Sequence, residues 1–458
     1  MEYRIEHDSM GEVRVPSEHL WGAQTQRSRE NFPIGVGIET MPSEIIQAFL
    51  TLKEAAAVCN HRLQPERMTD EKLKAIRQAA EKLRDPACAG EFPLVVWQTG
   101  SGTQTNMNVN EVMANLGNQI AGKKLLHPND DLNMSQSSND TFPTAMHIAA
   151  REVIVRRTEP ALRKLIETMC EKEEAFSDVL KCGRTHLQDA VPIRFGQEIS
   201  GWRASLERDL EQLEAGAAGL SNLALGGTAV GTGLNAPERF GEKAAEEISG
   251  ITGLRFVSDP NKFHALTSLD EMVFAHAALK SLAMDLMKIA NDVRWLASGP
   301  RNGLGEILIP ENEPGSSIMP GKVNPTQCEQ VTMVAARVLG NDTTVSFAAS
   351  QGNFELNVFL PVTAYSFLQS ARLLAESMDS FEKRCFRGIR VNGEKMKENV
   401  DRSLMTVTAL SPYVGYENAA RIAKRAYEDN LSLREAAMSL KIMTAEQFDE
   451  VFHPENMA

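Results

Sequence analysis

Apolar residues recur at every third or fourth position over several long stretches of the chain, which is the spacing of helices with one buried face. Between residues 194 and 223 the apolar steps of three and four residues resemble a coiled-coil seam, formed by Ile199, Trp202, Leu206, Leu210, Leu213, Ala217 and Leu220. Helices are predicted over residues 43–64, 69–84, 144–176, 194–223, 266–298, 326–350 and 354–384, with a further one reaching about residue 120. We expect Ser43 and Thr69 to cap the first two.

These helices predict a mainly α protein built around a central bundle of long helices, because no sustained alternation of period two indicates a sheet. Long helical patterns begin near residue 141, and the composition shifts again near residue 390. We therefore expect an N-terminal domain over 1–140, a central helical bundle domain over 141–390 and a small C-terminal domain over 391–458.

Charge and cysteine content narrow the classes of function. The chain has 458 residues and a formal net charge of −13, which argues against nucleic acid or an anionic membrane as the main partner. Its six cysteines form no C-x-x-C pair, so we expect a reducing compartment and no metal site. The first residues lack the features of a signal peptide, and no stretch is apolar enough to span a membrane, so a cytoplasmic location is expected.

Four segments share an unusual composition, each with Ser, Thr, Asn or Gln at a break beside a long helix. They are residues 99–108, 135–140, 183–188 and 315–325. Taken singly, each is typical of a solvated loop. If the helix ends converge, their neutral donors and Lys322 would form a pocket suited to a small dicarboxylate.

Two Gly-rich segments imitate nucleotide-binding motifs without matching them. Residues 225–233 do not fit G-x-G-x-x-G, and no clear strand precedes them. The segment from Gly315 to Lys322 is one residue too long for a P-loop, and Val323 replaces the required Ser or Thr. Neither segment predicts a nucleotide site.

Residues able to move protons accompany the polar segments, namely Ser316 or Ser317, His186 and Glu329. Removal of a proton from carbon beside a carboxylate passes through a dianionic enolate, so the site must hold the extra charge. Lys322 and oriented backbone N–H groups could do so.

The segment Gly315-Ser316-Ser317-Ile318-Met319-Pro320-Gly321-Lys322-Val323-Asn324-Pro325 resembles the signature of the fumarase/aspartase superfamily. Residues 99–108, 127–131, 135–143, 183–188 and 351–357 are similar to other blocks of that superfamily, so the resemblance covers essentially the whole chain. The pairs Thr185-His186 and Gly321-Lys322, with Ser137-Ser138-Asn139, resemble the iron-independent class II fumarases more than the aspartases. Aspartate ammonia-lyase is the alternative enzyme, and a catalytically silent scaffold is the alternative without activity.

The resemblance implies a three-domain fold and reversible hydration of fumarate to (S)-malate, a reaction of the tricarboxylic acid cycle, through an aci-carboxylate intermediate. It implies no cofactor and a homotetramer whose active sites combine segments from three subunits. Ser316 resembles the base that removes the C3 proton, and His186 with Glu329 resembles the pair that handles the water. Positions implied to bind substrate are Ser101, Gly102, Thr103, Asn106, Ser137, Ser138, Asn139, Thr185, Ser317, Lys322, Val323 and Asn324. Positions implied for a second anion site are His127, Pro128, Asn129 and Asp130. Lys124 precedes that site where an Arg is common.

Overall fold

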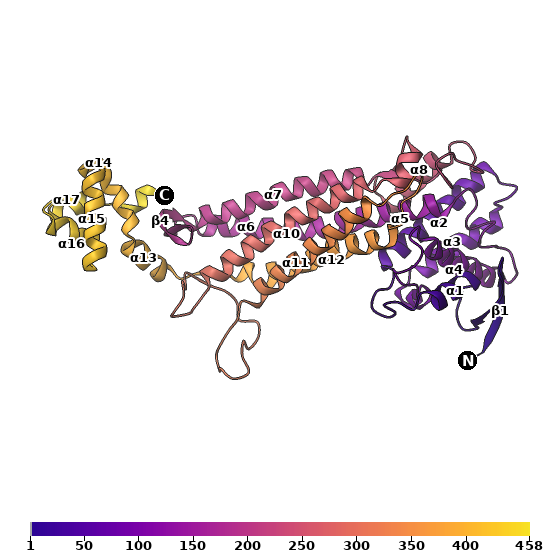
Figure 1. Ribbon diagram of the computed structural model, residues 1–458, viewed down its shortest axis with the longest axis horizontal. Helices are drawn as coiled ribbons and strands as arrows, with labels where there is room; N and C mark the ends of the chain where they lie inside the picture. Colours follow the sequence, from indigo (N-terminus) through magenta and orange to yellow (C-terminus); the bar gives the residue numbers. More distant parts are fainter. Residues whose placement is uncertain (1) are drawn as a thin grey trace. The chain divides into compact units, whose positions relative to one another are not determined.

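The computed structural model describes residues 2–458 and is mainly helical (Figure 1). The chain forms two compact units. Unit 1 comprises Met1–Pro160, Asp209–Ala283 and Val334–Ala375, and unit 2 comprises Ala161–Arg208, Met284–Met333 and Glu376–Ala458. Four long helices have residues in both units: α7 (Phe195–Gly219), α10 (Asp270–Leu296), α11 (Thr326–Ala349) and α12 (Leu360–Arg384).

Unit 1 contains the first hairpin and the shorter helices that follow it. Its other elements are β1 (Tyr3–Asp8), β2 (Gly11–Pro16), α1 (Ala23–Asn31), α2 (Ser43–Leu63), α3 (Asp70–Leu83), η1 (Pro86–Glu91), α4 (Thr103–Ala121), α5 (Ser138–Val153), the π-helical turn η2 (Ile154–Thr158), β5 (Asn222–Leu223), α8 (Phe240–Thr252), β6 (Val257–Ser258) and α9 (Lys262–Thr267). Helix α2 packs against α3, α5 and α8. Its side chains Ile45, Phe49, Leu52 and Ala56 are buried at steps of three and four residues, as the pattern predicts.

Unit 2 contains a hairpin and the C-terminal helices. Its other elements are α6 (Glu159–Ala175), which begins just before the boundary, β3 (Leu180–Thr185), β4 (Gln188–Arg194), β7 (Ile307–Leu308), η3 (Phe386–Gly388), β8 (Arg390–Val391), α13 (Gly393–Arg402), η4 (Leu404–Leu410), α14 (Ser411–Val414), α15 (Tyr416–Asp429), α16 (Leu433–Ser439), α17 (Ala445–Val451) and η5 (Pro454–Met457). A compact apolar cluster includes Leu410, Ile422, Ala436 and Phe448, all buried. The division of the chain into three consecutive domains stays a prediction.

Polar side chains join the long helices within each unit. In unit 1, buried His276 of α10 contacts Asp342 Oδ1 of α11 at 3.0 Å and Ser370 Oγ of α12 at 2.9 Å. In unit 2, Trp202 Nε1 of α7 donates to Asp292 Oδ2 of α10 at 3.0 Å. Six of the seven seam side chains of 194–223 are buried and Leu210 is half-buried, so the seam packs within the chain.

Prolines account for two differences from the predicted helices. Residues 144–176 do not form one regular helix, because the π-helical turn Ile154–Thr158 separates α5 from α6. Pro160 follows it, and a proline has no N–H to donate and clashes with the carbonyl four residues earlier. The predicted helix 354–384 begins only at Leu360, with Pro361 in its first turn, where a proline is tolerated.

Two further differences concern helix starts. Thr69 caps α3 as predicted and accepts from Lys72 N, but Ser43 is the first residue of α2 and Pro42 occupies the cap position. Helix α1 starts at Ala23 because buried Glu111 of α4 accepts N–H groups from Gly22, Gln24 and Thr25. Within residues 2–458, no helix is long and apolar enough to cross a membrane.

Candidate active site

The predicted site residues fall into two groups, one in each compact unit. Unit 1 holds the segments 99–108, 127–131 and 135–140, and unit 2 holds 183–188 and 315–325 together with Glu329.

The first group begins at the N-terminus of α4. Gly102 is the cap residue in a left-handed conformation with φ of +73°, and a Cβ there would lie 2.0 Å from Cδ2 of Phe142. Only glycine fits this turn. Ser101 and Thr103 flank it, with their hydroxyl oxygens 2.9 Å apart. Two hydroxyls at a helix N-terminus favour an anion through the helix dipole and the free N–H groups.

Asn106, one turn further along α4, connects this segment to α5. Its buried Nδ2 donates to Ser138 Oγ at 2.9 Å and to Asn133 Oδ1 at 3.1 Å, while its Oδ1 accepts from Thr141 Oγ1 at 3.3 Å. Asn106 and Ser138 are therefore in direct contact, and both residues belong to the predicted pocket. Ser138 accepts from Asn106, so its own O–H remains available to donate.

The N-terminus of α5 is fixed by a capping box between Ser137 and Asp140. Asn139 Nδ2 donates to the carbonyl of Ala229 at 2.8 Å. Asp140 Oδ2 accepts from Gly226 N at 3.0 Å and Thr228 N at 2.9 Å, so this buried carboxylate also holds the Gly-rich segment 225–233. Burial raises the pKa of Asp140 to about 6, and backbone N–H groups oppose that shift.

Lys53 of α2 contacts the segment that leads into α5, and it is not among the residues predicted from the sequence. Its side chain is buried, and its Nζ donates to Asn133 Oδ1 at 3.2 Å and Gln136 Oε1 at 3.0 Å. Burial lowers the pKa of Lys53 to about 7, opposed by the charge of Asp140. The signal in the sequence is a lone lysine on the apolar face of a helix, between Leu52 and Ala55.

The residues predicted for a second anion site form a turn after α4. His127 Nδ1 accepts from Asn129 N and Asp130 N, both at 3.3 Å, and Asp131 Oδ2 accepts from His127 N at 2.7 Å. The side chains of His127 and Asp130 are 52% and 80% exposed. Pro128 lies inside this turn, and anion binding there stays a prediction.

In unit 2, Thr185 and His186 lie at the tip of the β3–β4 hairpin, where only an interruption between helices was predicted. His186 and Leu187 both have left-handed φ values, +57° and +59°. A two-residue hairpin of this kind normally uses Asn-Gly, and other side chains in this conformation cost about 1–2 kcal/mol each. Thr185 and His186 are exposed, so the hairpin presents both side chains outward at the cost of local strain.

A buried ion-pair cluster fixes the base of this hairpin. Arg184 contacts both carboxylate oxygens of fully buried Glu306, at 2.5 and 3.1 Å, and Asn399 Nδ2 donates to the same carboxylate at 2.8 Å. Burial disfavours the charge of Glu306, but Arg184 and the nearby Lys181 outweigh it and lower the pKa of that carboxyl. The hairpin tip is thus strained while its base is rigid.

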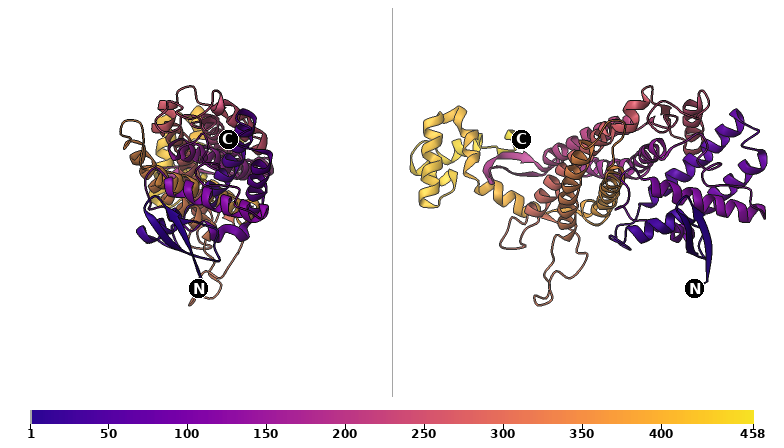
Figure 2. Two further views of the ribbon diagram at one scale, coloured as in Figure 1. Left: turned by 90° about the vertical axis from the view of Figure 1, so that its right-hand side faces the viewer. Right: turned by 45° about the vertical axis from the view of Figure 1, so that its right-hand side comes forward.

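The predicted signature segment 315–325 forms a loop between β7 and α11, which Figure 2 shows projecting from the helices. Gly315 N donates to the carbonyl of Lys322 at 2.8 Å, and a Cβ on Gly315 would lie 2.6 Å from that oxygen. Within the loop, Ser316 Oγ accepts from Ile318 N at 3.2 Å and Met319 N at 3.1 Å. These two donors stabilise negative charge on the Ser316 oxygen.

Lys322 and Asn324 complete the loop. Lys322 Nζ donates to Asn324 Oδ1 at 2.7 Å, and Asn324 Nδ2 donates to the carbonyl of Gly315 at 2.7 Å. Ser317 and Val323 are exposed on the same loop, Val323 by 37%. Glu329 lies in the first turn of α11 and is half-buried. Over residues 2–458, no hydrogen bond joins Glu329 to His186.

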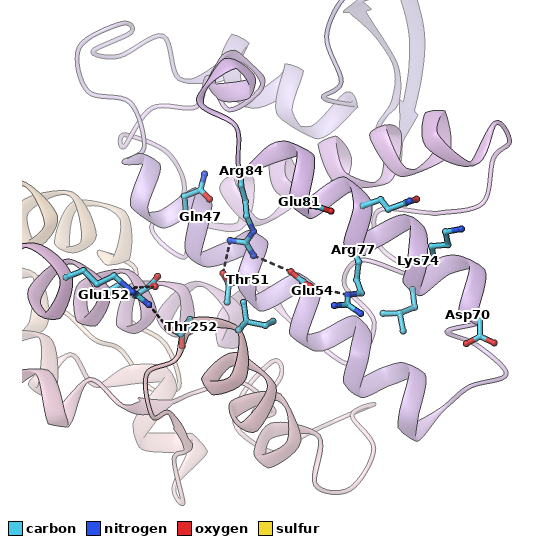
Figure 3. A pocket seen from close by; sticks show the side chains of 14 residues that line it. Gln47, Thr51, Glu54, Asp70, Lys74, Arg77, Glu81, Arg84, Glu152 and Thr252 are labelled. Carbon is cyan, nitrogen blue, oxygen red and sulfur yellow. Dashed lines mark hydrogen bonds and ion pairs between the residues drawn. The ribbon is translucent and has the colours of Figure 1, made fainter.

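A pocket of about 890 Å³ in unit 1 lies elsewhere, along α2 and α3 (Figure 3). Its charged lining is balanced, with Lys74, Arg77, Arg84 and Arg156 facing Glu54, Asp70, Glu81 and Glu152. Arg77 Nε and Arg84 Nη2 both contact Glu54, at 3.3 Å each. None of the predicted site residues lines this pocket. In the described part of the chain, no group of three or more His, Cys, Asp or Glu is placed to hold a metal ion.

Comparison with known proteins covers the whole chain. The family model described as "Lyase" matches residues 11–340, and the one described as "Fumarase C C-terminus" matches residues 407–458. A Bacillus cereus protein named fumarate hydratase class II is 60% identical over 461 residues, covering 100% of this chain and 99% of the relative. A Helicobacter pylori protein of the same name is 58% identical over 462 residues, with the same coverage. The crystal structure of a class II fumarase from Schistosoma mansoni has a TM-score of 0.96 at 41% identity, covering 100% of this chain and 99% of that one.

Proposed function

Because this chain belongs to the lyase family and, within it, to the class II fumarate hydratases, we propose which of its residues carry out the reaction. The reaction is the reversible hydration of fumarate to (S)-malate. The names of the full-length relatives do not favour the aspartate ammonia-lyase alternative.

Ser316 is the proposed base that removes the C3 proton of malate. A serine hydroxyl is a weak base unless its alkoxide is stabilised. The observation that supports this role is the loop itself, because Ser316 Oγ accepts two backbone N–H groups while Lys322 belongs to the same closed loop. Proton removal leaves a dianionic aci-carboxylate, whose added charge Lys322 and the Asn324 amide would stabilise.

His186 is the proposed acid for the second half of the reaction. The C2–O bond breaks, and the departing hydroxyl takes a proton from His186 and leaves as water, so that fumarate results. Glu329 would pair with the imidazolium and orient it. The strained left-handed conformation of His186 at a rigidly supported hairpin tip supports a role in chemistry.

The remaining polar residues are the proposed substrate-binding positions. Ser101, Thr103 and Asn139 lie at the N-termini of α4 and α5, where a carboxylate is electrostatically favoured. We propose a homotetramer in which each site combines segments from three subunits. Large exposed apolar side chains on the long helices support self-association, among them Phe274, Met284 and Trp295 on α10 and Met333 and Phe347 on α11.

We also propose that the reaction serves the tricarboxylic acid cycle in the cytoplasm and needs no metal. The six cysteine thiols are free, and four of them are buried, which supports a reducing compartment.

The assay that tests the proposed function offers (S)-malate and L-aspartate separately to the purified protein, with and without a chelator. Fumarate is followed by its ultraviolet absorbance. We expect fumarate from malate and none from aspartate. Fumarate from aspartate alone would assign the aspartase reaction, and fumarate from neither would indicate a silent scaffold. Activity that disappears only when chelator is added would overturn the metal-free mechanism.

A further inference from the structure

We propose that Lys53 is a positioning residue that fixes the direction of a hydrogen-bond chain ending at Ser138, so that Ser138 donates its O–H to a substrate carboxylate. This inference rests on the proposed function of Ser138 as a substrate-binding residue.

The chain starts where Lys53 Nζ meets two oxygens. The nitrogen lies 3.2 Å from Asn133 Oδ1 and 3.0 Å from Gln136 Oε1. A lysine amine carries at least two N–H donors in either protonation state, so both partner atoms act as acceptors. The amide of Asn133 is therefore oriented with its oxygen toward Lys53, and its Nδ2 donates to the carbonyl of Gln136 at 3.3 Å.

Asn133 then sets the direction of Asn106. Because Asn133 Oδ1 accepts, the group of Asn106 that lies 3.1 Å from it must be the NH₂. The other hydrogen of the same NH₂ goes to Ser138 Oγ at 2.9 Å. Asn110 also approaches Asn133 Oδ1, at 3.4 Å, but its own buried Oδ1 has no hydrogen-bond partner. The Asn110 contact orients Asn133 in the same sense, but it is longer than the 3.2 Å contact from Lys53 Nζ to the same oxygen, so we treat Lys53 as the stronger constraint.

Ser138 is the end of the chain. Its oxygen already accepts from Asn106, so its hydroxyl hydrogen is directed elsewhere. It is the first residue of α5 and half-buried, hence accessible to a ligand. A carboxylate oxygen only accepts, so a serine fixed as a donor binds it, whereas a serine free to rotate must be ordered on binding.

The alternative is that Lys53 only fills space and satisfies polar groups. Replacing it with methionine, which has a similar length and no donor, separates the two roles. A purely structural role would change stability without a selective change in carboxylate affinity. A positioning role would raise KM for (S)-malate and weaken binding of succinate, a saturated dicarboxylate that cannot react, while changing kcat less.

The experiment is a double-mutant cycle on the full-length protein with K53M, S138A and the double variant. We expect K53M to raise KM and the succinate Kd by about ten- to a hundredfold, as for loss of one oriented hydrogen bond to a charged group. We expect the double variant to match S138A alone, because both changes remove the same donor. Effects that multiply, or an unchanged KM in K53M, would overturn the inference.

One control variant and one substitute variant complete the test. Lys262→Met removes another buried lysine amine in unit 1, one that donates to the Leu223 carbonyl and Ser258 Oγ at 2.7 Å each, and it should leave KM unchanged. If K53M does not fold, Asn133→Ala breaks the same chain one residue later and replaces it in the cycle. A wild-type protein that converts neither malate nor fumarate would contradict the proposed function instead.

Discussion

The residues of the candidate site differ in how far a single chain prepares them for chemistry. Ser316 already accepts two backbone N–H groups, and Asn106 already contacts Ser138. Within residues 2–458, by contrast, no hydrogen bond joins His186 to Glu329, and His186 is exposed. This difference is consistent with the proposed homotetramer, in which other subunits would complete each site.

Replacement of Ser316 by alanine should lower kcat by about 10²–10⁴-fold, the usual contribution of a positioned proton-transfer group. Binding of succinate, measured by calorimetry, should change little, because the loop is closed by Gly315, Lys322 and Asn324. Ser317→Ala is the matched control, because Ser317 neighbours Ser316 and has only a proposed role in substrate binding. This variant should affect KM more than kcat. A Ser316 variant with near-normal kcat would reassign the base.

Replacement of His186 by asparagine should lower kcat with little change in KM if the imidazole acts in the transition state. Steady-state kinetics with (S)-malate measures both constants. A rise in KM alone would reassign His186 to substrate binding.

At the scale of elements, helix termini determine where the polar residues stand. Helix α4 begins and ends with left-handed glycines, Gly102 at φ of +73° and Gly122 at φ of +68°. Gly102 is tightly enclosed by Phe142, whereas a Cβ on Gly122 would meet no atom within 4 Å. An alanine at position 122 therefore tests backbone strain alone, whereas an alanine at position 102 adds a steric clash with Phe142.

Gly122→Ala should cost about 1–2 kcal/mol of unfolding free energy, the price of a side chain in the left-handed region. Gly102→Ala should cost at least a further 1–3 kcal/mol, because its methyl group must also displace the Phe142 ring. Chemical denaturation monitored by circular dichroism compares the two. Equal losses would show that Phe142 moves without cost.

The long helices could be predicted from the sequence because their apolar spacing is local and regular. The hairpin that carries His186 is not predicted by its own residues, because the Arg184–Glu306 ion pair that fixes its base joins residues far apart in the sequence. Lys53 was missed for a similar reason, because its partners Asn133 and Gln136 lie 80 and 83 residues away. The signature loop was identified through its resemblance to a family, whereas its composition alone is also typical of a solvated loop.

At the scale of the molecule, neither unit holds all of the predicted site residues, and a pocket of about 890 Å³ in unit 1 contains none of them. The proposed homotetramer, with segments from three subunits in each site, is open to a direct test. Met333 on α11, 66% exposed in the single chain, is a probe of the proposed subunit interface.

Met333→Glu should shift the protein from a tetramer toward smaller species and reduce activity in parallel, because a charge would be buried at an apolar interface. Sedimentation velocity over a range of concentrations measures the species. Met10→Glu, at a position 80% exposed on the N-terminal hairpin, is the control and should leave the tetramer intact. An active monomer would contradict shared sites.

The central claim is that this chain adds water across the double bond of fumarate. Proton nuclear magnetic resonance of the wild-type protein with fumarate in D₂O tests it directly. We expect (S)-malate with a single deuterium at C3, delivered by the base, as the fumarate signal declines. Fumarate that persists unchanged, or malate without deuterium at C3, would contradict it.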